Sequence, residues 1–211
     1  PEMSHANVAY ERFTDTGPLA LLPMSDNRCA VVWSAVPEQA EALQALGDEE
    51  FLAKLEERFG GRLGRLRKVG RRAVYPLMRT DVAEIVRERL VLIGNAAHTV
   101  HPVAGQGFNL GLRDVAALAE VLSGALRAGE DIGSTSVLTR YSDWRRRDTR
   151  TIAAFTDTLV GLFSNDLGPL AVARNLGLIG VDLLPPAKRA LLRLSMGLSG
   201  RLPRLARGLS L

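Results

Sequence analysis

The sequence has little of what would cross-link it, anchor it or carry it into a membrane. It has one cysteine among its 211 residues, Cys29, which excludes an internal disulfide and fits a reducing compartment. No apolar run reaches the roughly 18 residues that a transmembrane helix needs. The N-terminal stretch lacks the basic start and apolar centre of a signal peptide. These absences predict a soluble globular protein with a cytoplasmic location.

Acidic residues are absent from the end of the chain. No Asp or Glu follows Asp182, whereas six basic residues do: Lys188, Arg189, Arg193, Arg201, Arg204 and Arg207. A basic end of this kind predicts contact with an anionic surface. The alternative is an ordinary bundle helix with a basic tail. The Arg145–Arg147 run is expected to be a solvated face rather than a nucleic-acid site, because no aromatic residues are interleaved with basic ones around it.

The stretch from Arg89 to Leu122 carries the clearest pattern in the chain. Its apolar run, Leu90–Ile93, predicts a buried strand. Glycines at 94, 105 and 107 and a proline at 102 follow, and they exclude regular structure. Apolar residues then recur at the spacing of one helix face, in a helix beginning near Phe108. They are Val115, Leu118, Ala119, Leu122 and Leu126. The order predicted is therefore strand, glycine-rich loop and helix.

Such a loop and helix start suit a particular kind of ligand. Glycines let the backbone approach a ligand closely, and the first turn of a helix has free N–H groups at the positive end of its dipole. Gly105 and Gly107 before a helix therefore favour an anionic or carbonyl-rich planar group. A plain strand-to-helix connection, with glycines present for packing, is the alternative that the residues alone leave open.

The same stretch resembles a known cofactor motif. GNAAHTVHPVAGQGFNLGLRD, Gly94 to Asp114, is similar to the second flavin-binding motif of the FAD-dependent aromatic hydroxylases of the para-hydroxybenzoate hydroxylase type, roughly G-D-A-A-H and then P-x-x-G-x-G-x-N. Three further stretches, Tyr10–Trp33, Arg71–Leu77 and Gly161–Leu178, resemble the ubiquinone-biosynthesis branch of that family, and most of all the 2-polyprenyl-6-methoxyphenol hydroxylases. The resemblance covers nearly the whole chain.

The resemblance implies FAD as cofactor and NAD(P)H as co-substrate. Eight positions are carried over from the motif as cofactor-binding residues: Gly94, Asn95, Pro102, Gly105, Gln106, Gly107, Phe108 and Asn109. By this resemblance Asn95 would bind the ribityl chain and Pro102 would lie against the flavin ring. Backbone N–H groups from Gly105 to Asn109 would stabilise the negative charge of reduced flavin. No catalytic side chain is assigned.

The chain departs from the family pattern in two ways. The usual Asp is Asn95 here, although its side-chain oxygen can also accept a hydrogen bond. The GxGxxG segment that holds the ADP part of FAD has no match, because Gly60–Gly64 follows a charged helix rather than a strand. A middle motif with a DG pair is also missing. The chain is therefore expected to be the C-terminal half of a longer enzyme.

The expected fold class is mixed, α+β or α/β, as a partial flavin monooxygenase fold. Residues 1–80 are expected to be a substrate-domain antiparallel sheet with a helical insertion. Residues 81–130 would be the C-terminal part of the FAD-binding domain, and residues 131–211 a C-terminal helical region.

Local patterns predict the individual elements. Strands are expected at 7–13, 18–24, 28–35 and 65–77, and helices at 37–46, 48–59, 136–164, 167–182 and 187–198. Pro23 predicts an edge strand or a bulge, Asp48 a helix cap, and Pro185-Pro186 a break. Residues 79–88 are expected to be mostly loop. The long helix has an apolar stripe expected to face the core: Leu138, Tyr141, Trp144, Ile152, Phe155, Leu159 and Leu162.

Two residue types with possible chemistry receive a structural interpretation. His98 and His101 have the spacing of a ligand pair, but no third ligand is evident nearby, so no metal site is predicted. His98 matches a histidine of the family motif that has a structural role. Cys29 is interpreted as a packed strand residue, because no basic neighbour is evident that would make its thiol reactive.

The resemblance implies a monooxygenase that hydroxylates a polyprenylated phenol in ubiquinone biosynthesis. In the family, NAD(P)H supplies electrons and reduced FAD forms a flavin hydroperoxide with oxygen. The isolated chain is expected to be inactive. Expected partners are the phenol, other ubiquinone-pathway proteins, and a membrane surface contacted by the basic end, which would give a peripheral position at the inner membrane; no nucleic acid is expected. The alternative is a non-catalytic assembly or binding module that retains the hydroxylase scaffold.

Overall fold

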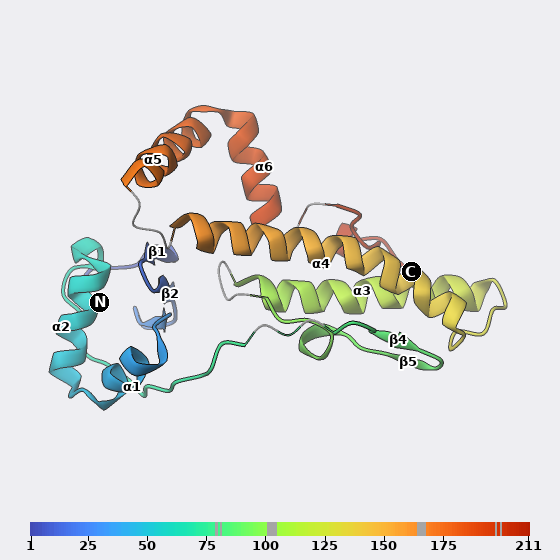
Figure 1. Cartoon of the computed structure of the whole chain (residues 1–211), viewed down its shortest axis with the longest axis horizontal. Helices are drawn as coiled ribbons and strands as arrows, with labels where there is room; N and C mark the ends of the chain where they lie inside the picture. Colours follow the sequence, from blue (N-terminus) through green and yellow to red (C-terminus); the bar gives the residue numbers. More distant parts are fainter. Residues whose placement is uncertain (79, 81, 101–104, 164–167, 197, 199) are drawn as a thin grey trace. The chain divides into compact units, whose positions relative to one another are not determined.

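The chain divides into two compact units (Figure 1). The computed structural model describes every residue except 79, 81, 101–104, 164–167, 197 and 199, and leaves out the side chains of 160, 168–171, 173 and 174. One unit comprises Pro1–Pro76 and Val160–Arg174, and the other Leu77–Leu159 and Asn175–Leu211. The predicted division into 1–80, 81–130 and 131–211 stays a prediction.

The described elements follow one another in this order: β1 (Tyr10–Thr14), β2 (Gly17–Pro23), β3 (Cys29–Trp33), α1 (Pro37–Ala45), α2 (Asp48–Phe59), η1 (Gly61–Leu63), β4 (Val86–Arg87), β5 (Leu90–Val91), η2 (Gly94–Ala96), α3 (Gln106–Arg127), α4 (Thr135–Phe163), α5 (Gly168–Leu183), α6 (Pro185–Ser195) and η4 (Leu205–Arg207).

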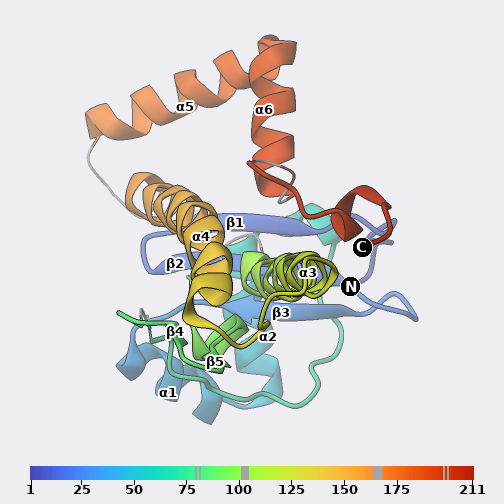
Figure 2. The same ribbon diagram turned by 90° about the vertical axis from the view of Figure 1, so that its right-hand side faces the viewer.

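The first unit is built on a three-stranded antiparallel sheet in the order β1–β2–β3 (Figure 2). On the central strand, Leu21 pairs with Tyr10 on one side and with Val31 on the other. This confirms the predicted meander. The edge or bulge position predicted for Pro23 is wrong, because Pro23 is the last residue of the central strand, opposite Cys29. At a strand end its missing N–H removes no interior ladder bond.

Helix α2 covers one face of this sheet. Leu19 and Leu21 are two residues apart on β2, so their side chains share a face, and they pack against Phe51, Leu55 and Phe59 of α2. These five side chains are all buried. The alternation of β2 and the helical spacing of α2 therefore meet in one apolar core.

Residues 65–77 form no strand, contrary to the prediction. The backbone N–H of Glu2 donates to the carbonyl of Arg65 at 2.8 Å. The Arg72 guanidinium donates to the carbonyls of Leu43 and Leu46, at 3.3 and 2.7 Å, where α1 ends. Because these contacts hold the segment against the N-terminal residues and the end of α1, it does not return to the sheet.

Two predictions for single residues in this unit have different outcomes. Asp48 is the first helical residue of α2 rather than its cap, which is Gly47; the Asp48 carboxylate accepts a hydrogen bond from Arg72 at 3.3 Å. Cys29 is confirmed as a packed strand residue. It is half-buried against the apolar core, and this burial raises the pKa of its thiol.

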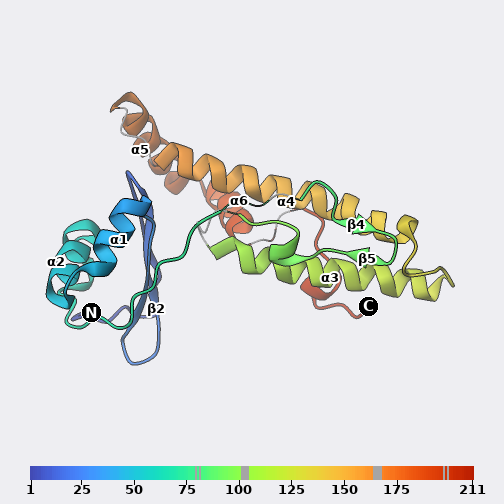
Figure 3. The same ribbon diagram turned by 60° about the horizontal axis from the view of Figure 1, so that its bottom comes forward.

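In the second unit α3 and α4 lie side by side, with the short β4–β5 hairpin beside them (Figure 3). Ala117 of α3 and Tyr141 and Trp144 of α4 form their shared core, against which Ile85 and Val91 pack from the hairpin segment. The hairpin tip is tied to the α3–α4 connection as well. The Arg89 N–H donates to the carbonyl of Gly133 at 2.9 Å, and its guanidinium to Asp131 at 2.8 Å.

The strand predicted at Leu90–Ile93 is shorter than expected and is not fully buried. Only Leu90–Val91 pairs, with β4, and Leu90 is exposed. Its partner β4 lies in the stretch predicted as loop. A ladder of two residues leaves the rest of this strand without strand neighbours. An apolar run is therefore not enough to predict that a strand is buried.

Helix α3 begins at Gln106, two residues before the predicted start, and its most deeply buried residues are not those of the apolar repeat, of which Leu118 packs against the core. Val115 and Leu126 are 51% and 70% exposed, whereas Leu110 and Ala117 are fully buried. Apolar residues occur on more than one side of this helix, so spacing alone did not identify the packed side.

The C-terminal helices are largely as predicted. α4 and α5 have the expected bounds within a residue or two, and four of the seven stripe residues of α4 are buried: Leu138, Tyr141, Trp144 and Ile152. The break predicted at Pro185-Pro186 is confirmed, because α5 ends at Leu183 and the two prolines occupy the first positions of α6, where a helix needs no N–H donor. Within the described residues, no helix combines the length and the apolar character needed to cross a membrane.

Neighbouring leucines of β2 test the packing of the first unit. Leu21→Ala should lower the free energy of unfolding by about 2 to 5 kcal/mol, because it leaves a cavity beneath α2. Leu22→Ala is the matched control, because Leu22 is 39% exposed, and it should cost at most about 1 kcal/mol. Urea denaturation followed through Trp33, in a Trp144→Phe background, measures both. Equal losses would contradict the packing of α2 on the Leu21 face.

Candidate functional site

The glycines of the predicted flavin motif present open backbone. Gly94 begins η2 and Gly105 precedes α3, and both have left-handed backbone conformations, with φ of 57° and 61°. Glycine adopts this conformation without steric cost. Among the described residues, no heavy atom lies within 4 Å of the point where a Cβ would stand on Gly94, Gly105 or Gly107. A ligand can therefore approach the backbone closely at all three positions.

The start of α3 is the second part of the motif. No side chain of the described residues caps this helix, so its first-turn N–H groups lie at the positive end of the dipole without a side-chain acceptor. Phe108 and Asn95 are exposed, and Gly107 and Asn109 are half-buried. Pro102 lies outside the described residues. The donor set and the open space fit an electron-rich planar group such as the edge of a flavin.

The Gln106 side chain has a role that the motif did not predict. It is buried, and its Nε2 donates a hydrogen bond to the carbonyl of Ser195 at the end of α6. This contact ties the first residue of α3 to a segment 89 positions later in the chain. The predicted ligand contact at Gln106 concerns its backbone, which this side-chain bond does not occupy.

One carboxylate, that of Asp114, holds the glycine-rich loop on α3. Its Oδ2 accepts hydrogen bonds from the Gly94 N–H at 2.8 Å and from His98 Nε2 at 2.9 Å, and its Oδ1 accepts one from Arg145 Nε at 2.6 Å. An ionised carboxylate only accepts, so His98 Nε2 carries the proton. A Cβ on Gly111 would lie 3.7 Å from the Gly94 Cα, which shows how closely the loop approaches the helix.

Asp114 belongs to a buried network of two arginines and two aspartates. Arg145 also pairs with Asp148, which accepts from Arg113 at 2.8 Å. The Asp114 side chain is 0% exposed. Burial opposes ionisation of Asp114, but the hydrogen bond from His98 and the charge of Arg145 hold the pKa of its carboxyl below the ordinary value. The network thus balances its charges within α3 and α4.

The sequence analysis missed this network and misplaced one of its members. Arg145 was predicted to lie on a solvated face, but its guanidinium is almost completely buried. A signal was present in the helical spacing, because Asp114 lies four residues after Leu110 and three before Ala117, both core positions. Arg145 likewise lies four residues after the buried Tyr141.

The histidine pair does not form a described metal site. His98 is engaged by Asp114, and His101 lies outside the described residues. In the part of the chain that the structure describes, no three His, Cys, Asp or Glu side chains are grouped as metal ligands would be. The role of His98 in the described geometry is to fix the loop to α3.

Comparison with known proteins agrees with this geometry. Residues 2–156 match the family model described as FAD binding domain. The chain is 47% identical to "Ubiquinone hydroxylase UbiL" of Rhodospirillum rubrum, over all of the chain and 50% of the relative. It is 39% identical to "3-demethoxyubiquinol 3-hydroxylase" of Escherichia coli, covering 93% and 50% of the two chains. The chain belongs to the ubiquinone-hydroxylase family of FAD-binding monooxygenases.

Further family members extend this comparison. "Ubiquinone biosynthesis monooxygenase COQ6, mitochondrial" of Homo sapiens is 35% identical, over 90% of the chain and 48% of the relative. The chain therefore spans about half the length of the curated relatives it matches. Among solved structures, PqsL of P. aeruginosa in complex with 2-aminobenzoylacetate has a TM-score of 0.61 and 24% identity, over 76% of this chain and 45% of that one. This likeness concerns the fold, and it confirms the mixed α/β, partial flavin monooxygenase fold.

Removing the charge of Asp114 tests the network that holds the loop. Asp114→Asn keeps the size of the side chain but leaves the buried Arg145 guanidinium without one of its two anions. The free energy of unfolding at neutral pH should fall by about 3 to 5 kcal/mol. Asp143→Asn is the matched control, because Asp143 is exposed on α4, and it should change stability by at most about 0.5 kcal/mol.

The pH dependence follows from the depressed pKa of Asp114. The stability that this lowered pKa contributes is present above the unfolded-state pKa, about 3.9, and is lost as pH falls through the folded-state pKa. The difference between the parent chain and Asp114→Asn should therefore narrow below about pH 4. Urea denaturation in buffers across this range measures it, and a difference that stayed constant with pH would contradict the assignment.

Proposed function

We propose that this chain supplies the flavin-facing half of an FAD-dependent monooxygenase that hydroxylates a polyprenylated phenol in ubiquinone biosynthesis. The observation that carries the proposal is the open glycine backbone beside the start of α3, held in position by Asp114. When bound, FAD reduced by NAD(P)H activates oxygen for insertion into an aromatic ring. The protein residues bind and orient the cofactor and set the charge around it.

The first turn of α3 would hold the electron-rich edge of the flavin. The backbone N–H groups of Gly107, Phe108 and Asn109 belong to this turn, and its dipole favours negative charge. The exposed Asn95 side chain offers an oxygen to the hydroxyls of the ribityl chain. Gly94 would allow that chain to pass close to the backbone.

The buried network of arginines and aspartates positions the glycine-rich loop without adding net charge near it. Arg113 and Arg145 are balanced by Asp114 and Asp148. The helix dipole is therefore left as a fixed source of positive potential at the start of α3, and it needs no rearrangement when the flavin becomes anionic. The carboxylate clamps the loop, and the amides face the ligand.

The names of the relatives support the class of substrate. Those from Rhodospirillum rubrum, Escherichia coli and Homo sapiens are all named for ubiquinone chemistry. Since the chain spans about half of each relative and has no GxGxxG segment for the ADP part of FAD, we expect no turnover from the 211 residues alone. A non-catalytic assembly or binding module is the second candidate, and Asn95 in place of the family's Asp is the observation that favours it.

Flavin binding by the full-length protein tests the proposal and separates the two candidates. The protein should be yellow when purified and should oxidise NAD(P)H. Asn95→Ala should weaken FAD binding about fivefold, because it removes one hydrogen bond of about 1 kcal/mol, and Asn95→Asp should retain it. Flavin fluorescence titration measures the affinities.

The matched control for this experiment is Asn175→Ala, at an exposed position on α5, which should leave FAD affinity unchanged. A full-length protein that stays colourless with added FAD and does not oxidise NAD(P)H would falsify the proposed enzyme activity and favour the second candidate, a non-catalytic binding module. If the protein binds flavin and oxidises NAD(P)H but hydroxylates no polyprenylated phenol, the proposed cofactor would stand and the proposed substrate class would be wrong.

Helix α6 supports a membrane surface as a further partner. Leu191 and Leu192 are exposed on this helix, which also carries Lys188, Arg189 and Arg193. A helix with apolar and basic side chains both exposed suits the interface of an anionic bilayer. A polyprenyl tail would reside in such a bilayer, so the basic end would bring the enzyme to its substrate.

Vesicle co-sedimentation tests this surface. Replacing Lys188, Arg189 and Arg193 together by Gln should weaken binding to phosphatidylglycerol vesicles about 100-fold, at about 1 kcal/mol for each basic residue. Neutral phosphatidylcholine vesicles should bind the parent chain weakly. The control replaces three exposed basic residues of the first unit, Arg65, Lys68 and Arg71, and should bind as the parent does. Equal loss in the two triple variants would remove the special role of α6.

A further inference from the structure

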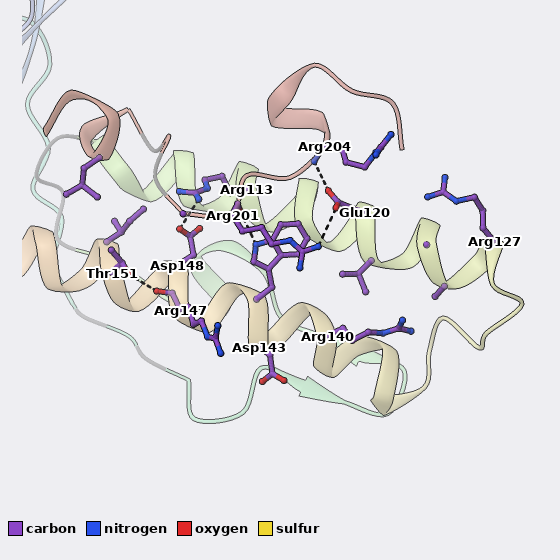
Figure 4. A pocket seen from close by; sticks show the side chains of 17 residues that line it. Arg113, Glu120, Arg127, Arg140, Asp143, Arg147, Asp148, Thr151, Arg201 and Arg204 are labelled. Carbon is purple, nitrogen blue, oxygen red and sulfur yellow. Dashed lines mark hydrogen bonds and ion pairs between the residues drawn. The ribbon is translucent and has the colours of Figure 1, made fainter. Parts of the chain in front are cut away.

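The second unit contains a cavity that the flavin motif does not use (Figure 4). It lies between the middle and end of α3, the facing side of α4, and the segment Gly200–Arg204, and its volume is about 820 Å³. It begins at Arg113, two turns beyond the start of α3, and extends to Arg127. It is thus distinct from the glycine-rich loop.

The lining of this cavity is strongly basic. Six arginines contribute to it against three acidic residues: Arg113, Arg127, Arg140, Arg147, Arg201 and Arg204 against Glu120, Asp143 and Asp148. Two of the acids are already engaged, because Asp148 pairs with Arg113 at 2.8 Å and Glu120 with Arg201 at 3.7 Å. Among the described residues, Arg127 and Arg147 make no salt bridge. An anion would therefore find guanidinium groups whose charge the protein has not neutralised.

The floor of the cavity is apolar and includes an ordered aromatic side chain. Val121 and Ala125 come from α3, and Trp144 and Ile152 from α4. The indole N–H of Trp144 donates to the carbonyl of Arg201 at 3.1 Å, and the Arg201 guanidinium lies over the indole ring, 3.9 Å from its centre. These two contacts fix the ring and the segment that closes one side of the cavity.

We propose that this cavity binds a small molecule with an anionic head, a phosphate or a carboxylate, and an apolar body. Arginine forks match such oxygen groups, and the excess of positive charge lines the rim. The apolar floor would cover the body of the ligand, and the volume is that of a small-molecule site. The proposal stands apart from the proposed function, because the flavin residues lie before Arg113 and the cavity residues begin there.

Titration of the 211-residue chain with octyl phosphate tests the proposal. Trp144 lies in the cavity and Trp33 in the other unit, so Trp33→Phe leaves a tryptophan that reports on the cavity alone. Octyl phosphate should give a saturable fluorescence change. Inorganic phosphate, which has no apolar body, should bind at least about tenfold more weakly, and the uncharged octyl glucoside should give no saturable change. Calorimetry on the parent chain repeats the measurement without the substitution.

Arginine variants assign the binding to the cavity. Arg127→Gln with Arg147→Gln should weaken octyl phosphate binding at least about tenfold. Arg146→Gln with Arg150→Gln is the matched control, because both residues are exposed on α4 outside the cavity, and it should bind as the parent does. No saturable binding, or equal loss in the two double variants, would overturn the proposal.

Two further measurements separate the possible sources of the anion and the two sites. Absence of octyl phosphate binding, together with phosphatidylglycerol vesicle binding that Arg127→Gln with Arg147→Gln weakens, would assign the basic rim to a lipid surface and overturn the small-molecule site. FAD affinity of the full-length protein should be unchanged by Arg127→Gln with Arg147→Gln. Failure of the cavity and failure of the flavin site can therefore be told apart.

Discussion

The buried pair of Asp114 and Arg145 is the interaction on which the second unit depends. Removing two charges from water costs several kcal/mol each, and burial is tolerated only when every charged atom is engaged. Here Asp114 accepts from a loop N–H, a histidine and an arginine, while Arg145 reaches a second aspartate. One pair therefore joins the glycine-rich loop, α3 and α4. An apolar pair of similar volume could pack these two helices equally well. We therefore interpret the ion pair as the contact that selects one geometry of the glycine-rich loop.

Sequence patterns predicted the order of elements well wherever one physical signal was enough. Alternation with turn residues marked the three strands of the first unit, and long apolar periodicity marked α4. Glycines and proline marked the loop. The buried side of α3 could not be predicted in this way, because apolar residues lie on several sides of the helix. The side that packs is centred on Asp114, and aspartate rarely enters a core without a partner. That partner, Arg145, lies 31 residues away, and nothing in a single sequence states that the two will meet.

The other wrong predictions have the same cause: contacts with distant parts of the chain override the structure that the local sequence favours. Residues 65–77 were predicted to form a strand, but the Arg72 guanidinium binds the carbonyls at the end of α1. The run Leu90–Ile93 looks like a buried strand, but it pairs only over two residues. In the site, the glycines could be identified because backbone conformation is a property of the residue itself. The ties made by Gln106 and Asp114 could not, because each depends on a segment brought close by folding.

Helix α3 contributes to three different features along its length. Its start faces the proposed cofactor, its middle holds the charge network, and its far half lines the basic cavity. Arg113 and Asp148 belong to both the network and the cavity lining. An anion that drew Arg113 toward itself would leave Asp148 more fully to Arg145, and Arg145 is the residue that holds Asp114. The cavity and the loop are thus separated in space but share a contiguous chain of ion pairs, which is the physical connection that any coupling between the two ligands would require.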